Sequence, residues 1–357
     1  MFAVKRFIEK IQKKGQAFQD AGSGTTPAVA LAIAKGRGLA NAGQYNEAIE
    51  LLTAANRKER HRELDKILLT LRSEGFLAQD WDTQSPEWPA SVPDQFDGEG
   101  IPSINADQLN ALAIRSGIEN RGSLIVRDLL DPSQVNTLRN DIDRVIAAHD
   151  AVASDSVNSE TEDWFEPFQR DTITKRDVKR AKGAMMTVDS PPALFDLLEV
   201  FEATGLSAVI REFFGEPPLL LARKLTLRRV RPDVSTGGWH QDGGFLGESI
   251  RSLNVWIALT DCGIDAPGMD IIAKRLDGIV ELGSGFAKWA TNPYAAAIVG
   301  EGCTERPEFK AGDAIVFDHL CLHRTAGDHS MTKTRYAIET WFMAPSTYDN
   351  QAGPILF

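Results

Sequence analysis

Apolar residues in the first quarter of the chain recur at the three- and four-residue spacing of helices. Residues 28–75 consist largely of Ala, Leu, Glu, Lys and Arg, which are strong helix formers. Gly43 interrupts the run, and Tyr45, Ile49 and Leu52 then recur at helical spacing. The pattern predicts a helical hairpin, and its piece ANAGQYNEAIELL is similar to the turn and second helix of a tetratricopeptide repeat. No second copy follows at that repeat's period of about 34 residues, so the sequence does not support a repeat array.

The pattern changes between residues 76 and 104. This stretch contains four prolines, several acidic residues and few periodic apolar positions, which is typical of a linker or an extended segment. Trp81 and Trp88 are expected to anchor it to a surface. We therefore expect three parts: an N-terminal helical segment over residues 1–78, a linker over 79–104 and a larger domain over 105–357.

From residue 105 onward, helical and β patterns are mixed. Residues 122–130 predict a short strand, after which Asp131 as N-cap and Pro132 at the first helical position start a helix. Residues 191–215 are also expected to be helical. After Pro217, short apolar runs separated by Gly and Asp turns predict strands within 219–232, 249–261, 313–320 and 335–344. Short strands at this spacing are typical of a sandwich or jelly roll.

Composition and charge narrow the class of protein. The 357 residues carry a net charge of −11, which gives no basic footprint for nucleic acid. Cys262, Cys303 and Cys321 are odd in number and without paired spacing, so we expect buried, reduced residues and a cytoplasmic protein. No stretch reaches the roughly 18 apolar residues of a membrane-spanning helix. The segment MFAVKRFIEKIQKKG lacks the features of a secretory signal and is expected to form an amphipathic helix, packed on the protein or lying on a membrane surface.

His240 and Asp242 stand one residue apart in the segment WHQDGG. On an extended strand, residues i and i+2 point to the same face, so the imidazole and the carboxylate can converge on one ion. A third ligand from a distant strand would complete the two-histidine, one-carboxylate triad of non-haem iron(II) oxygenases. His323 follows a predicted strand, and Arg335 opens the next one with a guanidinium suited to a carboxylate. His-x-Asp alone is frequent by chance, and the ordered C-terminal context is what supports a metal site.

Over residues 105–345 the chain resembles the phytanoyl-CoA dioxygenase family of iron(II)- and 2-oxoglutarate-dependent oxygenases. The motifs that carry the resemblance are RGSLIVRDLLDPSQVNTLRNDIDRV, WHQDGG, NVWIALTDCGIDAPGMDII and KAGDAIVFDHLCLH, with Arg335 downstream. The resemblance implies an α+β fold: a double-stranded β-helix core (jelly-roll, cupin-like) with flanking helices, preceded here by the N-terminal α-helical segment. It implies His240, Asp242 and His323 as ligands of Fe(II). It also implies Arg335 as the partner of the distal carboxylate of the cosubstrate, 2-oxoglutarate.

The resemblance also bears on the reaction. Relatives place polar cosubstrate contacts on the strands around WHQDGG, where this chain has Thr226, Arg228 and Asn254. Halogenating relatives replace the metal-binding carboxylate with a small residue, so Asp242 implies hydroxylation or a related oxidation such as desaturation. The expected substrate is a small molecule or a carrier-linked group, oxidised with release of succinate and CO2. Members usually carry a Pro-Gly-Ser-His-like segment that residues 271–276 replace here, which leaves the substrate class open.

Some candidates have rivals. His319 precedes His323 by four residues and is expected to support the site or to pack beside it. Arg324 is the rival of Arg335 for the cosubstrate. A group of basic residues near the triad suits either an anionic substrate or a solvated face; it comprises Lys224, Arg229 and Arg231.

Two other functions are compatible with the same residues. One is a zinc-dependent hydrolase that uses the His/Asp/His set to hold a metal-bound water. The other is a catalytically inactive scaffold whose helical hairpin binds a protein partner. The partners expected for the oxygenase are a small-molecule substrate and O2, and the sequence patterns do not predict an oligomeric state.

Overall fold

The computed structural model describes residues 25–79, 91–168, 176–221, 224–234, 236–280, 302–348 and 354–357. The expected N-terminal amphipathic helix, and Trp81 and Trp88 of the linker, lie outside these residues. Within them, no helix has both the length and the apolar character that crossing a membrane requires.

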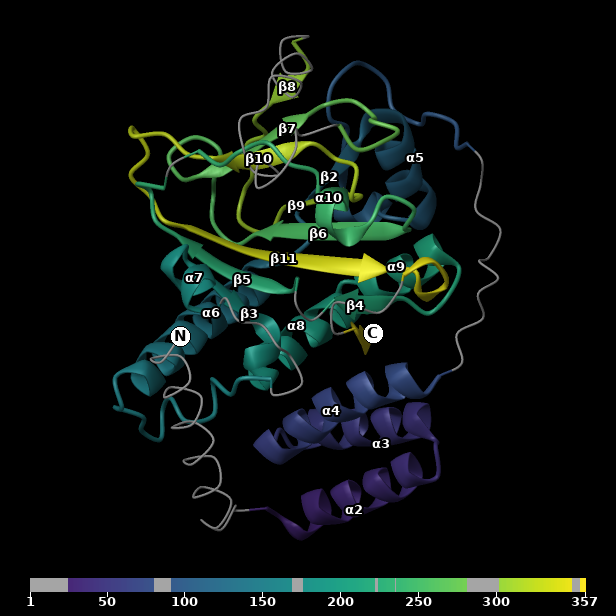
Figure 1. The fold of residues 1–357 in the computed structure, drawn as a ribbon, viewed down its shortest axis with the longest axis vertical. Helices are drawn as coiled ribbons and strands as arrows, with labels where there is room; N and C mark the ends of the chain where they lie inside the picture. Colours follow the sequence, from purple (N-terminus) through teal and green to yellow (C-terminus); the bar gives the residue numbers. More distant parts are fainter. Residues whose placement is uncertain are drawn as a thin grey trace.

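Two β-sheets and several helices form the layers seen in Figure 1. The large sheet runs in the order β1–β2–β9–β6–β11–β4–β12, with β5 beside β11 and β3 beside β5. Its strands are β1 (Ser103–Asn105), β2 (Ser123–Arg127), β3 (Ala184–Met186), β4 (Leu219–Leu221), β5 (Thr226–Val230), β6 (Ser252–Ala258), β9 (Ala314–Phe317), β11 (Arg335–Met343) and β12 (Pro354–Leu356). The small sheet has the order β10–β7–β8, made by β10 (His323–Ala326), β7 (Gly268–Ile272) and β8 (Thr304–Glu305).

One face of the large sheet turns toward the small sheet. Alternation along β11 puts Arg335, Ala337 and Glu339 on the same face, because successive strand residues point to opposite sides. Arg335 reaches the small sheet, where its Nη1 donates to the Gly268 carbonyl oxygen at 3.0 Å. Glu339 lies opposite Thr226 on β5 and Trp256 on β6. The polar side chains that share this inner face are those of Arg335, Glu339, Thr226, Arg228 and Asn254.

Helices cover the opposite, outer face. The hydroxyl of Tyr336 on β11 donates to Asp143 of α6 (Pro132–Ala153) at 2.9 Å, which places that helix against the sheet. Below the sheet in Figure 1 lie α8 (Pro191–Ala203) and α9 (Leu206–Phe214). The remaining helices of this part of the chain are α5 (Ala111–Arg121), α7 (Arg176–Ala181) and α10 (Gly243–Leu246).

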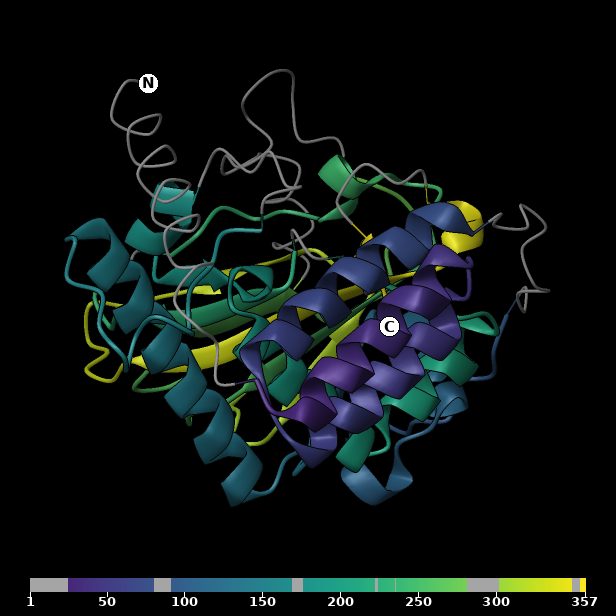
Figure 2. The same cartoon turned by 90° about the horizontal axis from the view of Figure 1, so that it is seen from below.

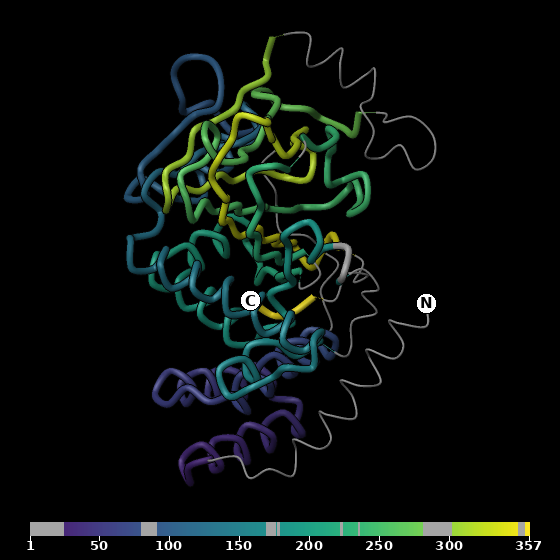
Figure 3. Tube along the Cα trace, turned by 90° about the vertical axis from the view of Figure 1, so that its left-hand side faces the viewer, coloured from purple at the N-terminus to yellow at the C-terminus, as the bar shows by residue number. Residues whose placement is uncertain are grey.

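The N-terminal helices form a separate layer beneath α8. They are α2 (Pro27–Asn41), α3 (Tyr45–Lys58) and α4 (Arg62–Ala78), so a third helix joins the hairpin that the sequence predicts. Figures 2 and 3 show this layer packed on one side of the molecule, next to the C-terminus. Helix α4 contacts α8 and β12, and Arg72 of α4 donates to the carbonyl oxygen of Leu356 at 2.9 Å. Ion pairs at the surface, Arg57–Glu199 and Arg60–Asp196, complete the contact.

Local sequence signals anticipate many of these elements. Asp131 caps α6 and accepts from the backbone N–H of Gln134 at 2.9 Å, in a capping box that confirms the predicted helix start. The helix expected over 191–215 is divided, because Gly205 adopts a left-handed conformation with φ of 74° between α8 and α9. The local sequence of strands β7 and β10 shows no clear alternation of apolar and polar residues. Both strands belong to the small sheet that carries part of the candidate site.

Candidate iron site

His240 and His323 are joined through their backbones. The N–H of each donates to the carbonyl oxygen of the other at 3.0 Å, forming an isolated antiparallel bridge. Their ring centroids lie 4.4 Å apart. His323 begins β10, which pairs with β7, so the small sheet holds this bridge in place. The structure thus brings together two of the three predicted ligands from segments that are distant in sequence.

The hydrogen bonds of both imidazoles leave Nε2 available to bind a metal. Nδ1 of His240 lies 3.0 Å from the Gly238 carbonyl oxygen, and Nδ1 of His323 lies 3.0 Å from the Cys321 carbonyl oxygen. A carbonyl at Nδ1 assigns the proton to that nitrogen and leaves Nε2 as the ligand atom. Burial lowers the pKa of His240 to about 4, and His323 adds to this effect while Asp242 opposes it. The His240 ring is therefore neutral at ordinary pH, as a metal ligand must be.

The backbone of Asp242 is not extended, in contrast to the strand conformation that the sequence predicts. It does not continue an extended strand: its φ of −66° and ψ of −22° place it at the start of α10, so the alternation expected for i and i+2 does not apply. The chain turns here because the Gly243 N–H donates to the His319 carbonyl oxygen at 2.8 Å. The buried carboxylate faces Lys224, whose Nζ is 3.6 Å from Oδ1. Among the described residues no three His, Cys, Asp or Glu side chains are arranged to hold a metal ion.

Arg335 is a buried cation that lies between the two sheets. Its Nη1 donates to the carbonyl oxygens of Gly268 and Pro267, while Nε has no hydrogen-bond partner in the described part of the chain. Burial first, and then Arg228, lowers the pKa of Arg335 to about 10, so the guanidinium remains positive at neutral pH. A buried guanidinium that forms no ion pair with a carboxylate among the described residues is suited to an anionic ligand.

Arg324, the alternative to Arg335, already forms an ion pair with Asp270. Arg324 binds Asp270 through Nε at 2.8 Å and lies over the ring of Trp239 at 4.6 Å. Its side chain therefore has a structural role on the small sheet, and Arg335 is the better match to the cosubstrate.

The three other predicted cosubstrate residues have different surroundings. Thr226 and Asn254 are both buried on the inner face. Thr226 donates to the Lys224 carbonyl oxygen at 3.3 Å, whereas Asn254 Oδ1 accepts no hydrogen bond from any described residue. Arg228 forms an ion pair with Glu339 and so is engaged within the protein.

Glu339 shares the inner face of the sheet with the predicted cosubstrate residues, although the sequence motifs do not single it out. Burial raises the pKa of its carboxyl, but Arg228, Lys224 and Lys179 outweigh burial and hold the pKa well below its usual range. The signal that could have placed it in the site is its position four residues after Arg335, on the same face of one strand.

His319 supports the site from outside it. Its Nδ1 lies 2.8 Å from the Ser252 hydroxyl, and its Nε2 lies 2.8 Å from the Glu248 carbonyl oxygen. Both ring nitrogens are thus engaged by the protein, and the His319 carbonyl oxygen accepts from the Gly243 N–H. The expectation that His319 is not a ligand agrees with these contacts.

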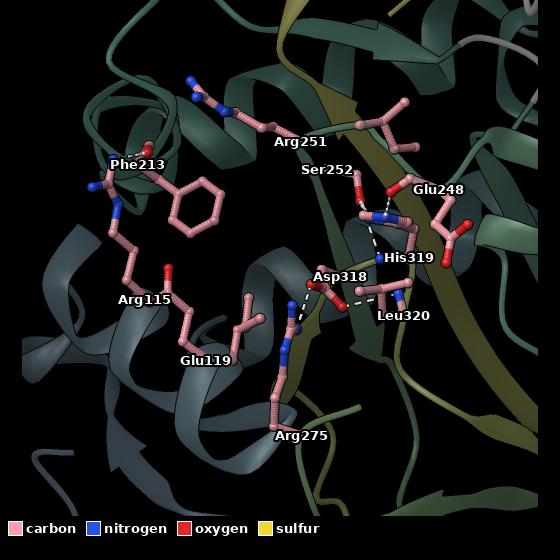
Figure 4. A pocket seen from close by; sticks show the side chains of 12 residues that line it. Arg115, Glu119, Phe213, Glu248, Arg251, Ser252, Arg275, Asp318, His319 and Leu320 are labelled. Atoms are coloured by element: carbon pink, nitrogen blue, oxygen red, sulfur yellow. Dashed lines mark hydrogen bonds and ion pairs between the residues drawn. The ribbon is translucent and has the colours of Figure 1, made fainter. Parts of the chain in front are cut away.

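A cavity of about 170 Å³ is lined in part by His319 (Figure 4). The Arg275–Asp318 ion pair, with Nη1 and Oδ2 2.6 Å apart, forms one wall, and Arg275 belongs to the segment 271–276 that departs from the family pattern. None of the predicted ligands or cosubstrate residues lines this cavity.

None of the three cysteines forms a disulfide with another; Cys262 and Cys321 are buried as expected, whereas Cys303 is only partly buried. Burial raises the pKa of the Cys262 thiol to about 12 and that of Cys321 further. Both behave as small apolar residues at neutral pH, as the sequence predicts.

Two imidazoles and a nearby carboxylate are the residue types of the iron-binding triad in non-haem iron(II) oxygenases. The family model described as phytanoyl-CoA dioxygenase matches residues 118–337, more than half of the chain, and the protein belongs to this family. It is therefore a 2-oxoglutarate-dependent oxygenase whose cofactors are Fe(II) and 2-oxoglutarate. The zinc hydrolase and the inactive scaffold have no comparable support.

Solved structures show a partial likeness. AviO1 from Streptomyces viridochromogenes Tue57 is 16% identical with a TM-score of 0.46, covering 68% of this chain and 98% of that one. EctD from S. alaskensis, solved with 2-oxoglutarate and 5-hydroxyectoine, is 16% identical with a TM-score of 0.44, covering 74% of this chain and 81% of that one. The epimerase SnoN, solved with Fe3+, alpha ketoglutarate and nogalamycin RO, is 16% identical with a TM-score of 0.40, covering 63% and 80%. No curated protein matches the sequence. The family assignment rests on the sequence model, not on these structural scores.

Proposed function

We propose that His240, Asp242 and His323 bind one Fe(II) and that Arg335 binds the distal carboxylate of 2-oxoglutarate. The observation that carries this proposal is the placement of Arg335. Its guanidinium is buried on the inner face of the large sheet, has an unsatisfied Nε among the described residues, and faces the small sheet that bears His323. A dicarboxylate between the metal and Arg335 would satisfy both ends of this arrangement.

Each residue of the chain has a defined task in this proposal. The backbone bridge sets the separation of the two imidazoles, and the carbonyls of Gly238 and Cys321 orient their Nε2 atoms. Arg335 orients the cosubstrate, and Asn254 Oδ1 offers an acceptor that the described protein groups leave unused. The aromatic rings of Phe317 and Trp256 limit water around the site. When bound, iron and 2-oxoglutarate supply the oxidising power, with release of succinate and CO2.

The reaction proposed is hydroxylation of a small-molecule or carrier-linked substrate. A carboxylate at position 242 fills the place where halogenating enzymes of the family have a small residue. Hydroxylation, or a related oxidation such as desaturation, is therefore the expected outcome.

The proposal extends to the architecture and the setting of the enzyme. We propose that the two sheets form the double-stranded β-helix of the family, supported by the contact of Arg335 with Gly268 across them. The division into a helical segment (1–78), a linker (79–104) and an oxygenase domain (105–357) is likewise proposed. The helices α2–α4 provide a surface for a protein partner. The buried thiols of Cys262 and Cys321 suit a reducing compartment such as the cytoplasm.

The test is an anaerobic titration of the full chain with Fe(II) and 2-oxoglutarate. We expect a weak visible charge-transfer band in the wild type. The Asp242→Ala/His323→Ala double variant should lose the band, and Arg335→Lys should weaken 2-oxoglutarate binding by about tenfold or more, because a bidentate charge-assisted contact is lost. His329→Ala, at an exposed histidine, is the matched control.

Two results would overturn the proposal. One is a folded, iron-loaded wild type that gives no band. The other is a double variant that retains the band.

A further inference from the structure

Gln241 stands between two of the predicted ligands, yet its side chain does not face solvent. Only 1% of Gln241 is exposed. Its Nε2 donates to the carbonyl oxygens of Leu320 at 2.6 Å and Gly278 at 3.0 Å, and its Oε1 accepts from the Val280 N–H at 2.7 Å. Both donor hydrogens and the acceptor oxygen of one buried amide are therefore bound by backbone groups. We call these three contacts the Gln241 junction.

The junction requires the amide of a glutamine. A glutamate at position 241 would bring its carboxylate oxygens against two carbonyl oxygens, and a methionine would leave two carbonyls and one N–H without partners in a buried place. Because losing the partner of a buried polar group is unfavourable, the three contacts hold the Gln241 side chain in one position. They therefore also hold the peptide groups that join Gln241 to His240 and Asp242.

Within the described chain, three hydrogen-bonded links join the ligand-bearing segments 240–243 and 319–323. The backbone bridge of the two histidines forms one end of this series, and the bond from the Gly243 N–H to the His319 carbonyl oxygen forms the other. Gln241 makes the middle link. It is made by a side chain, so a substitution can remove it and leave the two backbone links intact.

The other two contacts of the junction bring a third segment, Gly278–Val280, onto the same turn. Ile279, between them, donates its N–H to Glu248 Oε1 at 3.1 Å. A Cβ added at Gly243 would lie 3.1 Å from Ile279 Cδ1, so the isoleucine rests on the backbone directly after Asp242. The position of segment 278–280 and that of the metal-ligand turn are thus set by the same contacts.

We propose that Gln241 is a positioning residue of the iron site, which fixes the turn that carries Asp242 and couples it to segment 278–280. This inference rests on the proposed function, because it takes Asp242 as an iron ligand. Gln241 acts through the backbone and not by binding the metal. A turn that is already ordered gives up less conformational freedom when the metal binds. By thermodynamic reciprocity, bound Fe(II) should in turn stabilise segment 278–280.

The first test measures the Fe(II) affinity of the full chain without oxygen, and then the charge-transfer band with 2-oxoglutarate. Gln241→Met removes all three contacts, and Gln241→Glu removes the two that the amide donates. Both variants should bind Fe(II) about 10–100-fold more weakly and change the position or the strength of the band. The glutamate adds a negative charge near a cation, which by itself would strengthen binding, so a loss in both variants identifies positioning and not charge.

Two control variants should keep the Fe(II) affinity and the band of the wild type. Gln44→Met changes an exposed glutamine whose side chain does not cap the helix that follows it. Asp313→Ala removes a buried carboxylate that binds Arg127 Nη1 at 2.6 Å. This second control also loses buried hydrogen bonds, so it separates a local effect on the metal site from a general loss of stability.

The second test uses hydrogen exchange and needs no variant. The Val280 N–H donates to Gln241, so its exchange rate reports how often the junction opens. In the wild type, Fe(II) should slow exchange at Val280 by about tenfold more than at Leu138, which is buried in α6. In Gln241→Met, Fe(II) should have the same effect at both positions.

The outcomes separate this inference from the proposed function. Unchanged Fe(II) affinity in both Gln241 variants overturns the inference alone, as does an equal loss of affinity in Asp313→Ala. Stronger binding by Gln241→Glu overturns it too, because charge would then decide the effect. Equal slowing at Val280 and Leu138 in the wild type overturns the coupling to segment 278–280. A folded wild type that binds no Fe(II) and gives no band overturns the proposed function, and the inference with it.

Discussion

His240 and His323 are tied by two backbone hydrogen bonds of 3.0 Å, one in each direction. The link does not involve the imidazoles, so either ring can be removed without breaking it. We expect His323→Ala to fold like the wild type. Its affinity for Fe(II) should fall by more than the roughly 10–100-fold caused by losing a hydrogen-bond partner of a metal ligand. Circular dichroism and metal titration check this, with His329→Ala as control; a variant that binds Fe(II) normally would remove His323 from the ligand set.

Gly243 allows the close approach of the Asp242 turn to His319. An added Cβ would lie 3.0 Å from His319 Cδ2 and 3.1 Å from both the His319 carbonyl oxygen and Ile279 Cδ1. Gly243→Ala should therefore displace the carboxylate and weaken Fe(II) binding by about tenfold, with a stability loss of about 1 kcal/mol. At Gly244 an added Cβ meets nothing within 4 Å, so Gly244→Ala is the matched control. Equal metal affinity in the two variants would contradict the positioning role of this turn.

Asp313 is a buried carboxylate that joins the start of β9 to the loop after β2. It accepts from Arg127 Nη1 at 2.6 Å and from the backbone N–H groups of Lys310 and Asp128 at 2.9 Å and 3.0 Å. Asp313→Ala leaves these donors without their acceptor and should cost about 2–4 kcal/mol, measured by urea unfolding. Asp261→Ala removes an exposed carboxylate that contacts the same turn through Lys310 and should cost less than about 1 kcal/mol. Similar losses in both variants would show that burial of Asp313 is not what matters.

Asp141 is a buried acid whose charged form is disfavoured. Burial and the neighbouring Asp196 raise the pKa of Asp141 to about 7, from 3.8, and its Oδ2 has no hydrogen-bond partner among the described residues. The folded state therefore holds the proton more tightly than the unfolded state. This contribution is fully present below about pH 4 and is lost as the pH rises through about 7.

Asp141→Asn mimics the protonated form. Its advantage over the wild type should be small near pH 4 and reach about 1–3 kcal/mol above pH 7, or a few degrees in the melting temperature. Asp107→Asn, at an exposed acid, should change stability by less than about 0.5 kcal/mol at either pH. An advantage that shrinks as the pH rises would have the wrong sign for this account.

Many of the helix and strand boundaries in this protein follow from local sequence. Capping by Asp131, the strand after Gly122 and the strand that begins at Arg335 follow from residue types at fixed spacing. The pairing of distant segments is not local. Strand β10 forms because His323 pairs with Ile271 and the residues after His323 pair with the preceding residues of β7. The sequence around either segment does not indicate this register.

The same limit applies to the site. The identities of His240, Asp242, His323 and Arg335 could be proposed from ordered motifs. The helical turn at Asp242 depends on the His319 carbonyl, and the pairing of Arg228 with Glu339 depends on which face of β5 and β11 meets the small sheet. These relationships are set by tertiary packing, which overrides the strand pattern expected around WHQDGG.

Strand β12 lies between β4 and α4, so residues 354–357 form part of the surface against which the N-terminal helices pack. During synthesis, helices α2–α4 leave the ribosome early, yet the surface on which α4 rests is incomplete until Pro354–Leu356 have emerged. The helical layer can therefore contact α8 earlier, but it can complete its docking only after the strands that follow α8 have been made.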